Sequence, residues 1–126
     1  MNNAGLSTLG PIAESTVEGE LNMVEVDVAA VVHLTTALLP QMVAAKAGGI
    51  LNVASTAAFQ PIPGQSGYAA CKAFVLSYSK GLVGELRGSG VSVTALCPGP
   101  RTMVGLPQKR CTRSHSASPK PMWAAS

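Results

Sequence analysis

Ser55, Tyr68 and Lys72 are polar side chains whose types and spacing could let them act together. Tyr68 and Lys72 are four residues apart, and on a helix this spacing places both side chains on one face about one turn apart. A phenol has a pKa of about 10, so it exchanges protons near neutrality only with help from a neighbour such as a cation. Ser55 ends an apolar run that is typical of a buried strand, and residues 61–64 (PIPG) predict a loop between this strand and the helix. We therefore expect the hydroxyl, the phenol and the amine to converge.

The Tyr68 and Lys72 spacing is a weak signal by itself. At ordinary Lys usage, a Lys follows at the fourth position after roughly one Tyr in fifteen. A Tyr at an amphipathic surface, a solvated Lys and a Ser that ends a strand are the alternative interpretation. Two further motifs accompany the pair, NNAG at residues 2–5 and Cys-Pro-Gly-Pro at residues 97–100. Each could also be an ordinary turn, because Asn, Gly and Pro are favoured in turns.

Taken together, in this order and at these distances, the four elements resemble the classical short-chain dehydrogenase/reductase family from Asn2 to about Thr102. The resemblance implies an enzyme that transfers a hydride between NAD or NADP and a carbonyl or secondary alcohol. It implies that Tyr68 exchanges the proton, that Lys72 supports the phenolate and binds the nicotinamide ribose, and that Ser55 holds the substrate oxygen. The cofactor-binding residues that it implies are Asn2, Asn3, Ala4, Gly5, Tyr68, Lys72, Pro98, Gly99 and Thr102.

The sequence departs from the family pattern at two places. The family's long helix usually carries an Asn that holds a water in the proton relay, and Asp27 stands at that position here. An acid could still bind water, but it adds a charge to the site. After Pro100, Arg101 and Thr102 follow directly, whereas the family has an aliphatic residue before the Thr that bonds the cofactor amide.

The resemblance covers only the C-terminal part of the family's core. NNAG follows Met1 at once, and the sequence holds no TGxxxGxG loop of the kind that binds the dinucleotide pyrophosphate at a helix N-terminus. We therefore expect a truncated member of the family, in which the sequence does not decide between NAD and NADP. The family's substrate loop follows the Pro-Gly turn, where this sequence ceases to match the family, so the substrate is not identified either.

Apolar periodicity predicts alternating helices and strands. The expected elements are a helix over residues 16–47, a strand over 50–54, a helix from about 66 to 87 and a strand over 91–97. We expect Pro40 to kink or end the first helix, and Gly48 and Gly49 to stop it. The apolar run 50–54 indicates a strand covered on both faces.

Helices that alternate with strands predict parallel crossovers in an α/β sheet. With the resemblance, the expected fold is a partial doubly wound (Rossmann-like) parallel sheet lacking its N-terminal strands. Residues 1–102 would form the partial domain. Residues 103–126 contain no acids and much Ser, Pro, Lys and Arg, so we expect a disordered basic tail.

Composition restricts the partners. The formal charge of the chain is +3, but the residues up to Pro100 carry four basic and six acidic side chains, a net of 4 − 6 = −2, which argues against nucleic-acid binding by the folded part. The cysteines, Cys71, Cys97 and Cys111, form no CxxC pair and no metal-ligand spacing. We therefore expect no disulfide framework, no metal site and a cytoplasmic location. No role is assigned to Cys71 or to His33.

Two expectations concern surfaces. The most apolar helix is interrupted by Asp27, His33 and Pro40, and no basic segment precedes an apolar run, so neither a membrane span nor a signal peptide is expected. The resemblance implies a homo-oligomer that packs through the two long helices. This leaves an alternative to the enzyme, a non-catalytic chain that retains only the helical oligomerisation surface.

Overall fold

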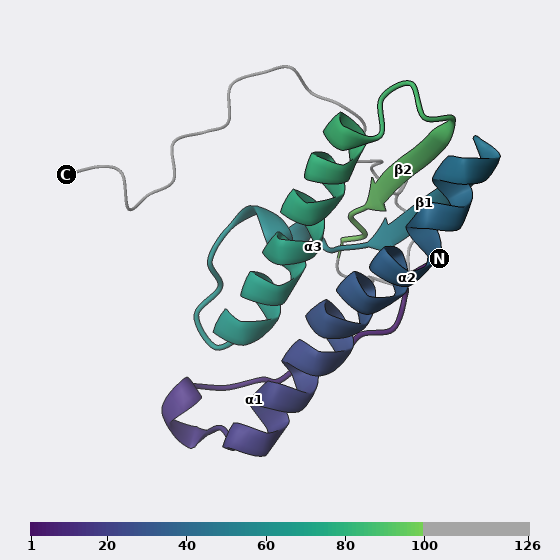
Figure 1. The fold of residues 1–126 in the computed structure, drawn as a ribbon. Helices are drawn as coiled ribbons and strands as arrows, with labels where there is room; N and C mark the ends of the chain where they lie inside the picture. The colour runs from purple at the N-terminus through teal and green to yellow at the C-terminus, as the bar shows by residue number, and fades with distance from the viewer. Residues whose placement is uncertain (100–126) are drawn as a thin grey trace.

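The computed structural model describes residues 1–99 of the 126-residue chain as an α/β unit (Figure 1). In chain order its elements are η1 (Ile12–Glu14), α1 (Val17–Val24), η2 (Glu25–Ala29), α2 (Ala30–Ala45), β1 (Gly48–Val53), η3 (Thr56–Phe59), α3 (Ser66–Glu85) and β2 (Val91–Leu96). The predicted alternation of helix and strand is confirmed. Both strands and α3 begin and end within two residues of their predicted limits.

The sheet is parallel, and β1 lies at its centre. β1 pairs with β2 along its whole length. On the other edge of β1, the Asn2 N–H donates to Leu51 O at 2.8 Å, and Asn2 O accepts from the Val53 N–H at 3.0 Å. The NNAG segment therefore lies beside β1 and runs in the same direction, so the order across the sheet is Asn2, β1, β2.

The helices α2 and α3 pack on the same face of this sheet. The helix α2 lies in the connection from the Asn2 segment to β1, and α3 lies in the connection from β1 to β2. Both connections step across the sheet in the same direction, and connections of the same handedness then place their helices on the same face. The core cluster reflects this arrangement, because Val31 of α2 and Val75 of α3 share it with Ala54 and Cys97 at the ends of the strands. Figure 1 shows the two helices side by side in front of the strands.

The opposite face of β1 is half-exposed. Ile50 and Asn52 are buried towards the helices, whereas Leu51 and Val53 alternate to the other face and are only half-buried. The prediction that this strand is covered on both faces is therefore wrong within residues 1–99. Leu51 and Val53 are only half-buried because both crossover helices, α2 and α3, pack on the same face of the sheet.

The long first helix is continuous from α1 through η2 to α2. Pro40 lies inside α2, which continues to Ala45, so the prediction that Pro40 ends the helix early is wrong. The irregular turn lies instead at η2, where the backbone is π-helical, a feature often found at functional positions. The helix ends at Lys46, whose φ of 51° is left-handed. Gly48 and Gly49, which we expected to stop the helix, begin β1.

This long helix buries a single stripe. Met23, Asp27, Val31 and Thr35 recur at every fourth position and are its buried residues, as expected for a helix that covers one face of a sheet. By length and composition alone the helix Val17–Ala45, which contains an 18-residue window with a mean hydropathy of 1.6, could also cross a membrane. Helices that pack against a sheet can meet the same criterion.

Candidate functional site

Tyr68 and Lys72 lie in the first two turns of α3, on one face as predicted. Lys72 Nζ is 5.6 Å from the centre of the Tyr68 ring. Tyr68 is half-buried, and Lys72 is 6% exposed. Few Lys side chains are buried to this extent unless they are paired, so Lys72 is not the solvated residue of the alternative interpretation.

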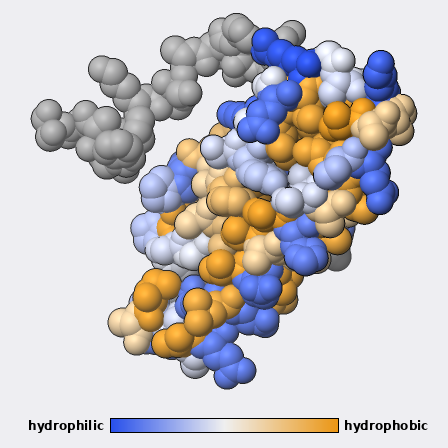
Figure 2. Space-filling model, in the orientation of Figure 1, coloured by the Kyte–Doolittle hydropathy of each residue, from blue (hydrophilic) through white to orange (hydrophobic). Residues whose placement is uncertain are grey.

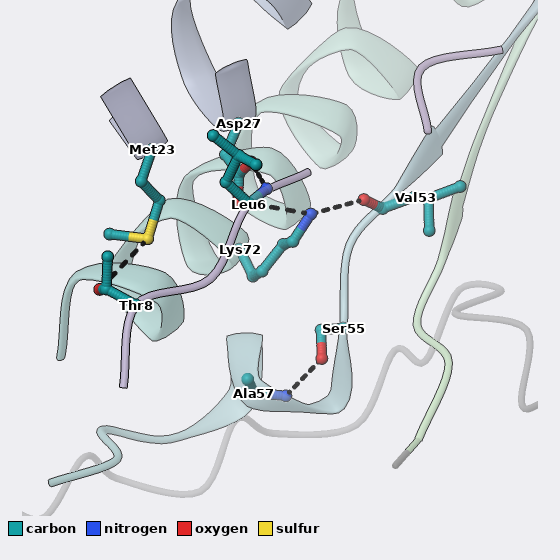
Figure 3. A network of polar contacts seen from close by, with 8 residues as sticks. All are labelled: Leu6, Thr8, Met23, Asp27, Val53, Ser55, Ala57 and Lys72. Carbon is teal, nitrogen blue, oxygen red and sulfur yellow. Dashed lines mark hydrogen bonds and ion pairs between the residues drawn. The ribbon is translucent and has the colours of Figure 1, made fainter. Parts of the chain in front are cut away.

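The Lys72 ammonium reaches the carboxyl end of β1 (Figure 3). Nζ donates to Val53 O at 3.5 Å and lies 3.8 Å from Asp27 Oδ2. An ammonium has three N–H donors, and the described residues offer Lys72 these two acceptors. A side chain at Gly5 would begin 3.2 Å from Nζ, a tight contact, so the NNAG segment passes close to Lys72.

Asp27 occupies the π-helical turn η2 and is 1% exposed. Its Oδ1 accepts the Leu6 N–H at 2.7 Å, so it joins the segment after NNAG to the long helix. The structure thus brings Asp27, Lys72 and the NNAG segment together. The sequence could place Asp27 only on the helix, because its contact with Lys72 depends on how α3 packs.

Ser55 lies two residues beyond β1 and caps the short helix η3. Its Oγ accepts the Ala57 N–H at 3.2 Å, and the side chain is half-buried. This bond uses a lone pair of the hydroxyl, so the O–H can still donate. The helix η3 packs against α3, and the predicted loop does bring the end of the strand back to the helix that carries Tyr68.

Within the NNAG motif, Asn2 connects to the rest of the fold through its side chain. Its Nδ2 donates to Asn52 Oδ1 at 2.7 Å, Asn52 Nδ2 donates to Ser79 Oγ at 2.9 Å, and Ser79 Oγ donates to Val75 O at 2.7 Å. This chain of hydrogen bonds ties the motif to β1 and α3. Sequence reasoning missed Asn52 and Ser79, although an Asn inside an apolar strand is a usable signal, because a buried amide needs partners.

The other predicted cofactor residues lie at the surface or beyond the described chain. Asn3, Ala4 and Gly5 are exposed. After β2, Pro98 O accepts the Thr56 N–H at 3.1 Å, and Gly99 is exposed. A side chain at Gly99 would meet only Thr56 Cγ2, at an ordinary 3.9 Å. Thr102 and the predicted tail over residues 103–126 lie outside the described residues.

Cys71 is a buried neighbour of the site. It is 5% exposed. Burial raises the pKa of the Cys71 thiol above its ordinary value, and the nearby Asp27 carboxylate raises it further, against a smaller lowering by Lys72. Both dominant causes favour the neutral thiol, which is the unreactive form.

These features define a parallel α/β unit of the Rossmann type, with polar side chains gathered at the carboxyl end of its central strand, where ligands bind in such folds. The chain belongs to the short chain dehydrogenase family, whose sequence model matches residues 1–109. It is 39% identical over 100 residues to the NADP-dependent 3-hydroxy acid dehydrogenase YdfG of Escherichia coli, covering 79% of this chain and 40% of that protein. It is 41% identical over 101 residues to the sulfoacetaldehyde reductase of Chromohalobacter salexigens, with the same two shares.

Solved structures agree with this assignment. Serine dehydrogenase from Escherichia coli superposes with a TM-score of 0.74 at 39% identity, covering 78% of this chain and 46% of that one. A short-chain dehydrogenase from Sphingobium yanoikuyae in complex with NADPH gives a TM-score of 0.76 at 38% identity, covering 80% and 40%. The chain therefore spans less than half the length of these relatives.

Proposed function

We propose that this chain carries the proton-transfer group of an NAD(P)-dependent oxidoreductase that acts on a carbonyl or a secondary alcohol. The observation that carries the proposal is the buried Lys72 ammonium, one turn from Tyr68 and next to the NNAG segment. Burying the charge of a Lys is costly unless the charge is paired or takes part in binding or catalysis. The named activities of the relatives, an NADP-dependent dehydrogenase and an aldehyde reductase, support the same reaction class.

Each side chain has a role that its position allows. The Tyr68 hydroxyl would give its proton to the substrate oxygen during reduction and take it back during oxidation. Lys72 Nζ, 5.6 Å from the centre of the Tyr68 ring, would place a positive charge near the residue that gives up the proton. The Ser55 O–H would donate to the substrate oxygen and share the charge that develops there. The nicotinamide, when bound, would supply or accept the hydride.

The residues present fit a nicotinamide cofactor in part. Lys72 has a third N–H for a ribose hydroxyl, beyond its contacts with Val53 O and Asp27. The exposed residues 3–5 and Gly99 leave backbone accessible on either side of the carboxyl end of β1. The choice between NAD and NADP stays open, because this sequence contains neither the glycine-rich pyrophosphate loop nor the residue after the second strand that binds the ribose 2′-hydroxyl or 2′-phosphate.

A second candidate function is self-association through α2 and α3. A groove of about 770 Å³ runs between them, lined by Thr35, Leu39, Val43, Tyr78 and Leu82 among others. Thr35 Oγ1 is buried in it without a hydrogen-bond partner in the described chain. Leu34, Leu38, Phe74 and Val83 are also exposed, and Figure 2 shows hydrophobic side chains gathered on this face. Such apolar surface is typical of interaction sites, so we infer a homo-oligomer.

For the other partners we infer no membrane and no nucleic acid, and a cytoplasmic location. The most apolar helix packs its buried stripe inside the fold, and the net charge of residues 1–100 is negative, with four basic and six acidic side chains.

Titration with nucleotide separates the two candidate functions. NADH or NADPH is added to the purified chain while nucleotide fluorescence is recorded, with Lys72→Met as the matched variant. The enzyme proposal predicts saturable binding that Lys72→Met weakens. Absence of binding at millimolar nucleotide, with the chain folded and oligomeric, would favour the self-association function.

A further inference from the structure

Asp27 is a buried acid that faces a buried cation. The Asp27 side chain is 0% exposed and that of Lys72 is 7% exposed, and Asp27 Oδ2 lies 3.8 Å from Lys72 Nζ. Asp27 Oδ1 accepts the Leu6 N–H at 2.7 Å, while Oδ2 has no hydrogen-bond partner in the described chain. Asp27 is also the only Asp in the sequence.

The groups around Asp27 leave Lys72 as its charge partner. Lys72 on α3 lies 3.8 Å from Asp27 Oδ2, the neutral Cys71 on the same helix is close enough to feel the Asp27 charge, and the Leu6 N–H bonds Oδ1. Glu20 on α1, which acts on the same Cys71, is a second acid and not a cation. A buried carboxylate without a cation is strongly disfavoured. The two opposite charges therefore stabilise each other inside the fold.

The position of the ammonium follows from these contacts. Figure 3 shows the Lys72 side chain extended between Val53 on β1 and Asp27 on the long helix. The bond to Val53 O is long, at 3.5 Å, and Asp27 Oδ2, at 3.8 Å, makes no hydrogen bond, so Asp27 acts on the ammonium through its charge. Asp27 is in turn anchored by the Leu6 N–H.

We propose that Asp27 is a positioning residue for Lys72, holding the ammonium by charge at the carboxyl end of β1. The resembled family has a neutral Asn at the position of Asp27. The role of Lys72 rests on the proposed function, but the pairing is a property of the chain without cofactor. It gives the site a carboxylate and ammonium pair in place of an isolated cation.

Selective acylation of lysines tests this directly. Asp27→Asn keeps the size of the side chain and an acceptor for the Leu6 N–H, and it removes only the charge. At pH 8 and without nucleotide, we expect acetic anhydride to modify Lys72 at least about fivefold faster in Asp27→Asn than in the unsubstituted chain, as read by mass spectrometry of peptides. Lys80, exposed on the same helix, is the internal control and should not change. An unchanged rate at Lys72 in a folded Asp27→Asn chain would overturn the proposal.

A double-mutant cycle decides the matter even where Asp27→Asn folds poorly. Lys72→Met leaves Asp27 buried without a cation, whereas Asp27→Asn with Lys72→Met leaves no buried charge. We expect the double variant to unfold at a higher urea concentration than Lys72→Met alone. A double variant that is no more stable than Lys72→Met contradicts the pairing. Neither readout involves cofactor, so a failure of the proposed enzyme function would leave both results unchanged.

Discussion

Asn52 Nδ2 donates a hydrogen bond to Ser79 Oγ at 2.9 Å, and the two residues are 0% and 1% exposed. Asn52 lies in β1, and Ser79 lies on α3, two turns after Lys72. The bond fixes how α3 lies along the strand, and therefore where Tyr68 and Lys72 stand relative to the carboxyl end of β1.

Ser79→Ala tests this relationship. The substitution leaves the buried Asn52 amide without its acceptor, so we expect the free energy of unfolding to fall by about 1 to 3 kcal/mol. Urea denaturation followed by circular dichroism gives the value. Ser77→Ala, exposed on the same helix, is the control and should change stability by less than about 0.5 kcal/mol. Equal effects of the two substitutions would show that the Asn52 bond contributes nothing.

Gly90→Ala should destabilise the turn that leads into β2. Gly90 has a φ of +81°, and a Cβ there would lie 2.2 Å from Lys46 O, a backbone atom. Strain of this kind costs about 1 to 3 kcal/mol. Gly84→Ala, inside α3 with nothing within 4 Å, should instead be stabilising by roughly 0.5 to 1 kcal/mol. The prediction fails where both variants melt at the temperature of the unsubstituted chain.

Much of the candidate site could be predicted from the sequence, because several of its residues lie close together along the chain. Tyr68 and Lys72 share a face through helical periodicity alone, and Ser55 follows from the end of an apolar run. The contact between Asp27 and Lys72 joins residues 45 positions apart, so it depends on how two helices pack. Periodicity cannot supply this information.

The wrong predictions about the fold also concern features that depend on packing and not on the local sequence pattern. The sequence predicts that Pro40 kinks or ends the long helix, and it does not end it, because the helix continues to Ala45 despite the lost hydrogen bond. The π-helical turn at Glu25–Ala29 leaves the apolar pattern unchanged, so the pattern does not reveal it. Leu51 and Val53 are apolar, as in a strand that is covered on both faces. They are half-exposed because both crossover helices pack on the other face of the sheet.

The pKa of Cys71 gives a pH dependence of stability. Burial and Asp27 raise the pKa of this thiol in the folded chain, so the unfolded chain loses the proton first as the pH rises. The stabilising contribution is therefore fully present below the unfolded thiol pKa of about 8.5, and it is lost as the pH rises through the folded value. We expect the urea midpoint to fall between pH 7.5 and 10, and to fall less in Cys71→Ala. A decline of the same size in Cys71→Ala would exclude Cys71 as its source.

Val43→Lys tests self-association. Val43 lines the groove between α2 and α3 and is 40% exposed, and a Lys there would place a charge in the apolar interface, which is costly when buried. We expect sedimentation velocity to report a lower oligomeric state for Val43→Lys. Val17→Lys, at a site 77% exposed at the start of α1, is the control and should sediment like the unsubstituted chain. Sedimentation as a monomer by the unsubstituted chain would remove the homo-oligomer inference.

A chimera separates proton transfer by Tyr68 from its packing. Residues 1–99 replace the matching segment of YdfG, the relative from Escherichia coli that is 39% identical, and NADPH-dependent turnover is measured with and without Tyr68→Phe. Because Phe keeps the ring and removes the oxygen, we predict a loss of about 10²- to 10⁴-fold in kcat, an unchanged melting temperature, and little effect of Tyr78→Phe on the same helix. A folded Tyr68→Phe chimera with turnover within about tenfold of its parent, or a parent that binds NADPH without turnover, would count against proton transfer by Tyr68.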